Sequence, residues 1–139
     1  MTKTFLYLYG VKTDNEIRQA MQDRILLLDG AMGTMLQQCG RSGNFDALNL
    51  SDPETVASVH RAYIEAGADI IGTNTFSSNR ISQREYGMEG QVAELARTGA
   101  KLARVAADAA AHKVWVAGCI GPTSKSLTLS SGPGAATAP

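Results

Sequence analysis

A carboxylate and two glycines follow an apolar run near the start of the chain, and together they could bind an amino acid. Asp29, Gly30 and Gly33 come soon after residues 25–28, which are Ile-Leu-Leu-Leu. A carboxylate in this place can accept a hydrogen bond from a substrate ammonium, and glycine lets main-chain N–H groups approach an anion closely. The segment could therefore hold both charged ends of a zwitterion. The alternative is structural: Asp29 would only cap the next helix, and the glycines would only form the turn.

Two later apolar segments also end in small or polar residues, which extends the candidate site. Thr73 and Asn74 follow the segment 69–72, and the tripeptide 121–123 follows the segment 114–120. Parallel strands place their carboxyl ends at one edge of a sheet, and α/β proteins bind their ligands at that edge. This convergence favours a functional site over simple turn formation.

The helices and strands that must position these residues alternate along the chain. We expect three strands, at residues 25–28, 69–73 and 114–120. The predicted helices cover residues 14–23, a short turn at 34–38, a helix from the N-cap Ser51 to Gly67, and residues 88–112. Short connections lead into each strand, so the alternation predicts right-handed βαβ units, a parallel sheet and the α/β fold class.

Two of these helices carry more specific signals. Ser51 and Glu54 have the spacing of a capping box, with Pro53 in the first turn. His60 lies within the apolar stripe of the same helix, so we interpret it as a hydrogen-bonded core residue and not as a catalytic one. For the later helix we expect an inner face formed by Val92, Leu95, Ala96, Leu102, Val105 and Ala109.

The composition argues against several classes of partner. The chain has 139 residues, a formal net charge of zero and 44% hydrophobic residues, which is typical of one small globular domain. Balanced charge argues against nucleic acid or an anionic membrane. No run approaches the ~18 apolar residues of a membrane span. The first ten residues do not resemble a secretory signal, so the cytoplasm is the expected location.

Five motifs follow one another along the chain: residues 28–34 (LDGAMGT), 60–71 (HRAYIEAGADII), 73–76 (TNTF), 86–89 (YGME) and 121–123 (GPT). Together, in this order, they resemble the homocysteine-binding domain of cobalamin-dependent methionine synthases, which are homocysteine S-methyltransferases. The resemblance covers roughly residues 22–130. It implies that the chain holds the first βα units, about three strands, of an incomplete (β/α)8 TIM barrel, a fold that typically needs ~250 residues.

The resemblance also implies a reaction and a set of site residues. In the family, zinc activates the thiol of homocysteine at the carboxyl ends of the strands, because a bound metal lowers the pKa of a thiol. Methylcobalamin then supplies the methyl group that gives methionine; betaine and S-methylmethionine are the donors of related enzymes, and that choice stays open. Asp29, Gly30 and Ala31 match the part that meets the amino and carboxylate groups of homocysteine, and Asn74 matches a position at the same mouth.

The chain departs from the family pattern at its cysteines. The zinc of the family is bound by three cysteines late in the barrel, and neither Cys39 nor Cys119 matches such a position. We interpret Cys119 as a small buried residue of the third strand and assign no role to Cys39. Gly72 replaces a glutamate that methionine synthases usually carry. We therefore assign no catalytic and no metal-binding residue, and expect this chain alone to bind neither zinc nor cobalamin and to be inactive.

The motifs divide the chain into a leader at residues 1–12, the N-terminal part of the barrel at 13–130 and a low-complexity tail at 131–139. We expect a fragment, whose partners are homocysteine and the missing half-barrel or the cobalamin module of the parent enzyme. The alternative is a non-catalytic truncated half-barrel that binds an amino acid or a partner chain. Three strands cannot close a barrel, so open strand edges should make the isolated chain self-associate or remain partly molten.

Overall fold

The computed structural model describes residues 13–125, so the predicted leader and tail lie outside the described residues. Its helices are α2 (Thr13–Asp23), α3 (Met32–Gln38), α4 (Leu48–Ser51), α5 (Pro53–Glu65), α6 (Arg80–Arg84) and α7 (Val92–Asp108). Strand β1 (Ile70–Gly72) lies between α5 and α6, and strand β2 (Trp115–Ala117) follows α7. The predicted α/β class is confirmed, whereas the described residues form a two-stranded sheet and not a barrel.

The two strands are parallel and lie side by side, as the βαβ pattern predicts. Ile70 is opposite Trp115 and Gly72 is opposite Ala117. The predicted first strand is reduced to a single parallel bridge between Leu28 and Ile70, next to a hydrogen bond from Asp29 N to Ile70 O of 2.9 Å. The segment that ends at Asp29 therefore runs beside β1, which is the middle element of the three.

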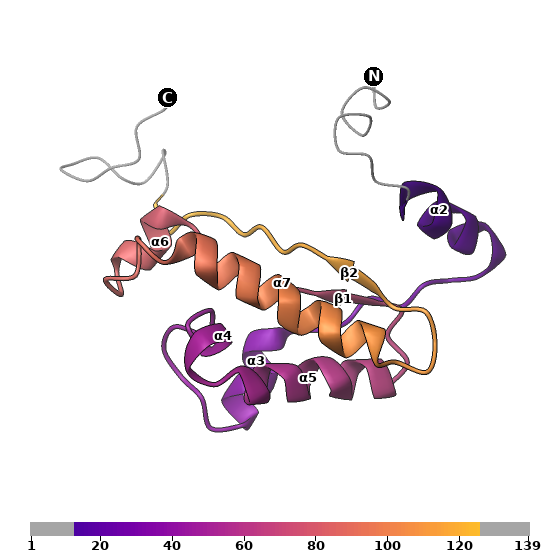
Figure 1. Cartoon of the computed structure of the whole chain (residues 1–139), viewed down its shortest axis with the longest axis horizontal. Helices are drawn as coiled ribbons and strands as arrows, with labels where there is room; N and C mark the ends of the chain where they lie inside the picture. The colour runs from indigo at the N-terminus through magenta and orange to yellow at the C-terminus, as the bar shows by residue number, and fades with distance from the viewer. Residues whose placement is uncertain (1–12, 126–139) are drawn as a thin grey trace, which may run out of the picture.

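Helices α5 and α7 pack against each other and against the same side of the strands (Figure 1). One apolar cluster lies between these helices and the sheet, with Ile71 and Ala103 fully buried. A second cluster joins α5 to α3 through Leu36, Val56 and Val59. Among residues 13–125, no helix is long and apolar enough to cross a membrane.

The expectation that residues 25–28 form a buried strand is wrong. Ile25 is 86% exposed, and Leu27 and Leu28 are 54% and 65% exposed. An apolar strand is buried only when a second layer covers it, and the described helices pack elsewhere. Polar contacts hold the segment instead: the Asp69 carboxylate accepts two hydrogen bonds from Arg24, at 2.6 and 2.8 Å, and one from Leu27 N at 2.9 Å.

The start of α5 also differs from the prediction. Ser51 is the last residue of α4, and Asp52 is the N-cap of α5, where its carboxylate accepts a hydrogen bond from Thr55 N at 3.4 Å. The same Asp52 is the C-cap of α4, so the two helices share one residue. Gly67 follows α5 with a φ of +100°, a conformation that glycine adopts readily, as predicted for this end. His60 is fully buried as expected, but neither ring nitrogen has a hydrogen-bond partner among the described residues.

Helix α7 is shorter than predicted, and its inner face agrees with the prediction only in part: Leu95 is fully buried, and Leu102 packs against the second apolar cluster. The predicted inner residue Val105 is 60% exposed, and the buried residues are Leu95, Gly99, Ala103, Ala106 and Ala107. Small residues on this face let the helix approach its neighbours closely. A Cβ atom at Gly99 would lie 2.7 Å from both Asn49 Nδ2 and Thr75 Cγ2, so this glycine is required by packing.

Candidate functional site

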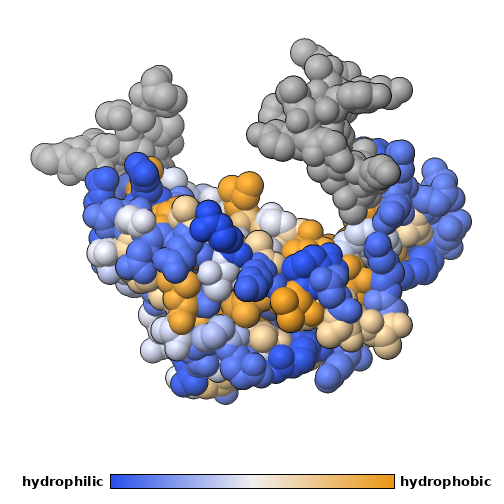
Figure 2. Space-filling view, viewed as in Figure 1, coloured by the Kyte–Doolittle hydropathy of each residue, from blue (hydrophilic) through white to orange (hydrophobic). Residues whose placement is uncertain are grey.

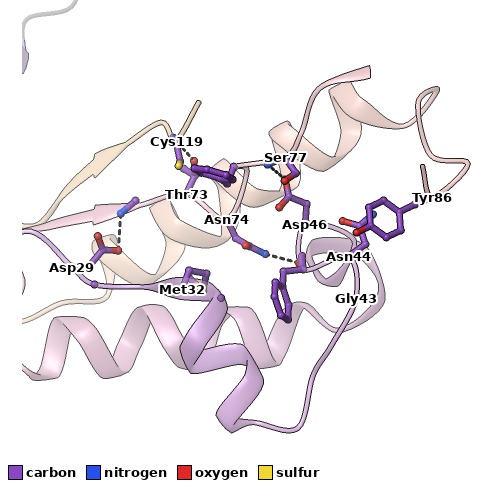
Figure 3. A pocket seen from close by; sticks show the side chains of 15 residues that line it. Asp29, Met32, Gly43, Asn44, Asp46, Thr73, Asn74, Ser77, Tyr86 and Cys119 are labelled. Carbon is purple, nitrogen blue, oxygen red and sulfur yellow. Dashed lines mark hydrogen bonds between the residues drawn. The ribbon is translucent and has the colours of Figure 1, made fainter. Parts of the chain in front are cut away.

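A cavity of about 370 Å³ lies at the carboxyl end of β1, where the sequence predicts a site. Three loop segments line it, within residues 29–33, 43–46 and 72–77, together with Tyr86 and Cys119. Figure 3 shows the labelled side chains around this space, with Asp29 at one side and Asn44, Asp46 and Tyr86 at the other. The first two predicted strand ends therefore meet as expected.

Asp29 borders the cavity and is held by the main chain of β1. Its Oδ2 accepts a hydrogen bond from Gly72 N at 2.8 Å (Figure 3). Burial raises the pKa of Asp29, and the Gly72 hydrogen bond opposes part of that increase. Asp29 does not cap α3, because the N-cap is Ala31 and no side chain provides a capping bond there. The expected alternative that Asp29 caps α3 is therefore wrong; its carboxylate lines the cavity and holds the main chain at Gly72.

The loop at Gly30 and Ala31 rests on α5. Tyr63 Oη donates a hydrogen bond of 3.3 Å to Ala31 O, and a Cβ at Gly30 would lie 2.9 Å from the same hydroxyl. The loop can approach the tyrosine only because residue 30 has no side chain. Tyr63, which packs against both apolar clusters, thus also supports one wall of the cavity.

Asn74 lies in the cavity wall with its amide group largely engaged inside the protein. Its Nδ2 donates to Phe45 O at 2.8 Å and to Asn49 Oδ1 at 3.0 Å. Asn49, which is 1% exposed, donates in turn to Asn74 O at 2.7 Å and to Leu95 O at 3.1 Å. Both N–H groups of Asn74 are therefore used to hold the neighbouring loop, and only its Oδ1 is left to meet a ligand.

Asp46 is a cavity residue that no sequence pattern predicts. It is 3% exposed, and its Oδ2 accepts hydrogen bonds from Ser77 N at 3.0 Å and from Ser78 Oγ at 2.7 Å. Burial raises the pKa of Asp46, and the bonds from the two serines oppose the increase. This carboxylate ties the loop before α4 to the loop after β1. No periodic pattern marks residues 40–50, so the sequence alone offers no signal for it.

Cys119 does not lie within a strand, because β2 ends at Ala117. Two threonines at the end of β1 hold its main chain: Cys119 N donates to Thr73 Oγ1 at 2.9 Å, and Thr75 Oγ1 donates to Cys119 O at 2.8 Å. The half-buried thiol lines the cavity. Burial raises the pKa of the Cys119 thiol, and the negative charges of Asp46 and Asp29 add to that increase, so the thiol is neutral at pH 7.

Residues 121–123, predicted at the end of the third strand, do not line the cavity. Gly121 N donates to Phe76 O at 3.2 Å, so this segment is held against the loop after β1. Thr123 Oγ1 donates to Lys125 O at 2.8 Å and faces no part of the cavity lining. The first two segments therefore meet as predicted, and the third reaches the cavity through Cys119 and not through residues 121–123.

The zinc that the resemblance implies does not fit the residues described by the structure. Residues 13–125 contain no group of three or more histidine, cysteine, aspartate or glutamate side chains that could hold a metal ion. Cys39 is exposed at the end of α3, whereas Cys119 lines the cavity. Because a zinc site needs four ligands, usually with at least three from the protein, these residues do not build one.

Comparisons with known proteins agree with the motifs. The family model described as homocysteine S-methyltransferase matches residues 26–138. The structure is similar to the metallated form of the homocysteine methyltransferase MmuM from Escherichia coli, with 29% identity and a TM-score of 0.67 over 76% of this chain and 41% of that chain. It is also similar to the oxidized form of MmuM, with 32% identity and a TM-score of 0.66 over 75% of this chain and 40% of that one. This chain thus spans about two fifths of the length of the structures that it matches.

Proposed function

This chain belongs to the homocysteine S-methyltransferase family, and from that membership we propose that its cavity binds homocysteine as the acceptor of a methyl group. The observation that carries the proposal is the position of Asp29. Its carboxylate is fixed by Gly72 N at the border of a cavity of about 370 Å³, which is large enough for a small amino acid. Among residues 13–125, no lysine, arginine or histidine lines this cavity, so Asp29 can attract a substrate ammonium without a competing cation from these residues.

The residues assigned from the sequence then have distinct roles. Asp29 accepts hydrogen bonds from the substrate ammonium through Oδ1, because Oδ2 is occupied by Gly72 N. The main-chain N–H groups of Gly30 and Ala31 contact the substrate carboxylate. Asn74 contributes its Oδ1 and, through its two donated bonds, keeps Phe45 and Asn49 in the cavity wall.

The reaction we propose is that of the family: the sulfur of homocysteine takes a methyl group from a donor, and methionine is formed. The sequences of the five motifs favour methylcobalamin as the methyl donor and a methionine synthase as the type of the parent enzyme. Zinc, when bound, supplies a thiolate at neutral pH. Because the described residues do not build a zinc site, we propose that the zinc ligands and the methyl-donor module belong to polypeptide outside residues 13–125.

A second candidate function is amino-acid binding without catalysis. It is favoured by the same mismatch between the described residues and a zinc site. In that case Asp29 keeps its role, since it acts in binding and not in the chemical step. The two candidates differ only in whether methionine is formed.

Homocysteine binding can be tested by calorimetric titration of the chain. Asp29→Asn should weaken binding at least tenfold, because an amide cannot neutralise the ammonium, while it can still accept from Gly72 N. Asp108→Asn is the matched control, since Asp108 is 67% exposed on α7, far from the cavity lining. N-acetylhomocysteine, which lacks the ammonium, should bind as weakly as homocysteine binds to the Asp29 variant. Equal affinities of wild type and Asp29→Asn would refute the proposal.

A further inference from the structure

One aspartate of the chain is followed directly by glycine, and this pair lies at the border of the cavity. Asp29 and Gly30 form the only Asp-Gly step among the 139 residues, and both line the cavity. Glycine has no Cβ, so its main-chain nitrogen can approach the preceding side chain with little steric hindrance. Attack of that nitrogen on the aspartyl carboxyl group closes a succinimide ring, so the chemistry of this pair extends beyond ligand binding.

The main-chain nitrogen of Gly30 is available as the nucleophile. Within residues 13–125, its N–H group donates no hydrogen bond, whereas the neighbouring Asp29 N donates to Ile70 O at 2.9 Å. Gly30 is also exposed, so water can take up the amide proton during the attack. The nitrogen therefore gives up no contact to the described part of the chain when it moves toward the Asp29 side chain.

The Asp29 carboxyl group is held in a way that favours attack at Cγ. Its Oδ2 accepts the hydrogen bond of 2.8 Å from Gly72 N, and its Oδ1 accepts none within residues 13–125. Burial raises the pKa of Asp29, which enlarges the fraction of neutral acid at a given pH. When the proton is on Oδ1, Gly72 N stabilises the negative charge that develops on Oδ2, as main-chain donors do in an oxyanion hole.

Packing keeps a glycine at position 30, so the chain cannot escape this chemistry by a simple substitution there. An added Cβ would lie 2.9 Å from Tyr63 Oη and 3.2 Å from Tyr63 Cε1. Relief of these contacts needs a shift of the loop or of Tyr63, whose hydroxyl donates to Ala31 O. The pair that places a carboxylate at the cavity is thus also the pair in this chain that is most prone to ring closure.

We propose that Asp29 and Gly30 form a site of spontaneous modification, at which the aspartate converts to isoaspartate through a succinimide. The bond between Gly30 N and Asp29 Cγ forms, the bond between Cγ and Oδ1 breaks, and the amide proton and the Oδ1 hydroxyl leave as one water molecule. Water then opens the ring. Addition at Cγ restores aspartate, whereas addition at the main-chain carbonyl carbon of residue 29 breaks the original peptide bond and gives isoaspartate.

Conversion to isoaspartate changes both roles of this residue in the cavity wall. The main chain then runs through the former side chain, and the carboxylate is attached directly to Cα. The carboxylate no longer reaches Gly72 N, so the loop loses its hydrogen bond to β1. The modification therefore removes the anionic group from its fixed place at the border of the cavity.

Incubation of the full chain at pH 7, followed by peptide mapping, tests the proposal. Electron-transfer mass spectrometry distinguishes isoaspartate from aspartate in each peptide. Isoaspartate should form at residue 29 at least tenfold faster than at Asp108, which precedes Ala109 and is 67% exposed. Asp108 is a fair comparison because it lies on α7, where hydrophilic residues reach the surface (Figure 2). In chain enriched in isoaspartate, hydrogen exchange at Gly72 N should accelerate at least tenfold.

A variant and an unfolded control separate ring closure in the fold from general ageing. Asp29→Glu keeps a carboxylate on a longer side chain, so the same attack closes no succinimide and residue 29 should yield no isomer. Equal rates at residue 29 and Asp108 would overturn the proposal. Isoaspartate at residue 29 in urea-unfolded chain but not in folded chain would also overturn it, since the fold would then prevent the attack.

Homocysteine should slow the reaction, and this part of the test alone rests on the proposed function. In that function the substrate ammonium binds Asp29 Oδ1 and the substrate carboxylate binds Gly30 N, so both reacting groups are occupied. A rate that saturating homocysteine leaves unchanged would contradict the proposed function. Isoaspartate at residue 29 of the free chain would still confirm the modification, so the two proposals fail separately.

Discussion

His60 should make the stability of this chain depend on pH between about 7 and 5. The side chain is fully buried on α5, and neither ring nitrogen has a hydrogen-bond partner among the described residues. Burial lowers the pKa of His60 from 6.5 to about 4. The imidazole is therefore neutral in the folded chain and would have to enter water, or find a new partner, to become charged.

The size of the effect follows from proton linkage. Because the pKa of His60 is lower in the folded chain, the unfolded chain binds the proton first as the pH falls below 6.5, and the folded state loses stability. With pKa values of 6.5 and about 4, the free energy of unfolding should fall by about 2 kcal/mol between pH 7 and pH 5. Below pH 4 the loss levels off at about 3 kcal/mol.

Urea unfolding at pH 7 and pH 5, followed by circular dichroism, measures this difference. His60→Leu removes the titrating group and should reduce the pH-dependent loss by about 2 kcal/mol. Asp29 and Asp46, whose pKa values are raised by burial, bind protons more tightly when folded and so oppose the loss, but equally in both proteins. His112→Gln is the control, since His112 is exposed and the dependence should survive there. The same pH dependence in wild type and His60→Leu would refute the reasoning.

Three further predictions concern packing, acid stability and metal. Gly99→Ala should lower the free energy of unfolding in urea by about 1–2 kcal/mol, because overpacking against Asn49 outweighs the helix preference of alanine. Gly118→Ala should change the free energy of unfolding little, since its Cβ would meet nothing within 4 Å. Equal effects of the two substitutions would contradict the prediction. Hydrogen bonding to Arg24 lowers the pKa of Asp69 to about 2. The Asp69 carboxylate therefore stabilises the fold fully above pH 3.8, and this stabilisation is lost as the pH falls through 2. Asp69→Asn should abolish that part of the acid unfolding transition, and an unchanged transition in the variant would contradict the prediction. Purified chain should contain less than about 0.1 zinc per molecule by elemental analysis, and stoichiometric zinc would show that ligands exist which the described residues do not supply.

The sequence predicts the order of the elements well, because local signals set it. Pro53 in the first turn, Gly67 at the end of α5 and the apolar segment at β1 each act within a few residues, and the structure contains the corresponding elements. The prediction for the face of α7 is confirmed at Leu95 but wrong at Val105, because it favours large apolar residues, whereas close packing also selects Gly99 and the alanines near it. Periodicity alone cannot distinguish these two cases.

The candidate site is predictable where a strand end supplies the residue and not where a loop does. Asp29 and Asn74 follow apolar segments, and both line the cavity. Asp46 lies in the loop before α4 and Asn49 within that four-residue helix, and their positions depend on contacts with residues 25 to 46 positions away. The exposure of Ile25 could not be predicted from the sequence either, because an apolar run does not reveal whether a second layer of the fold covers it.

The residue shared by α4 and α5 restricts where the chain can change in length. Asp52 ends one helix and begins the next, so an insertion beside it would rotate α4, and with it Phe45 and Asp46, relative to α5. Gly40 and Gly43, by contrast, lie in a turn with φ values of +76° and +81°, and a Cβ at either position would meet nothing within 4 Å. Evolutionary gain or loss of residues in this half of the domain should therefore accumulate near residues 40–43 and spare the junction at Asp52.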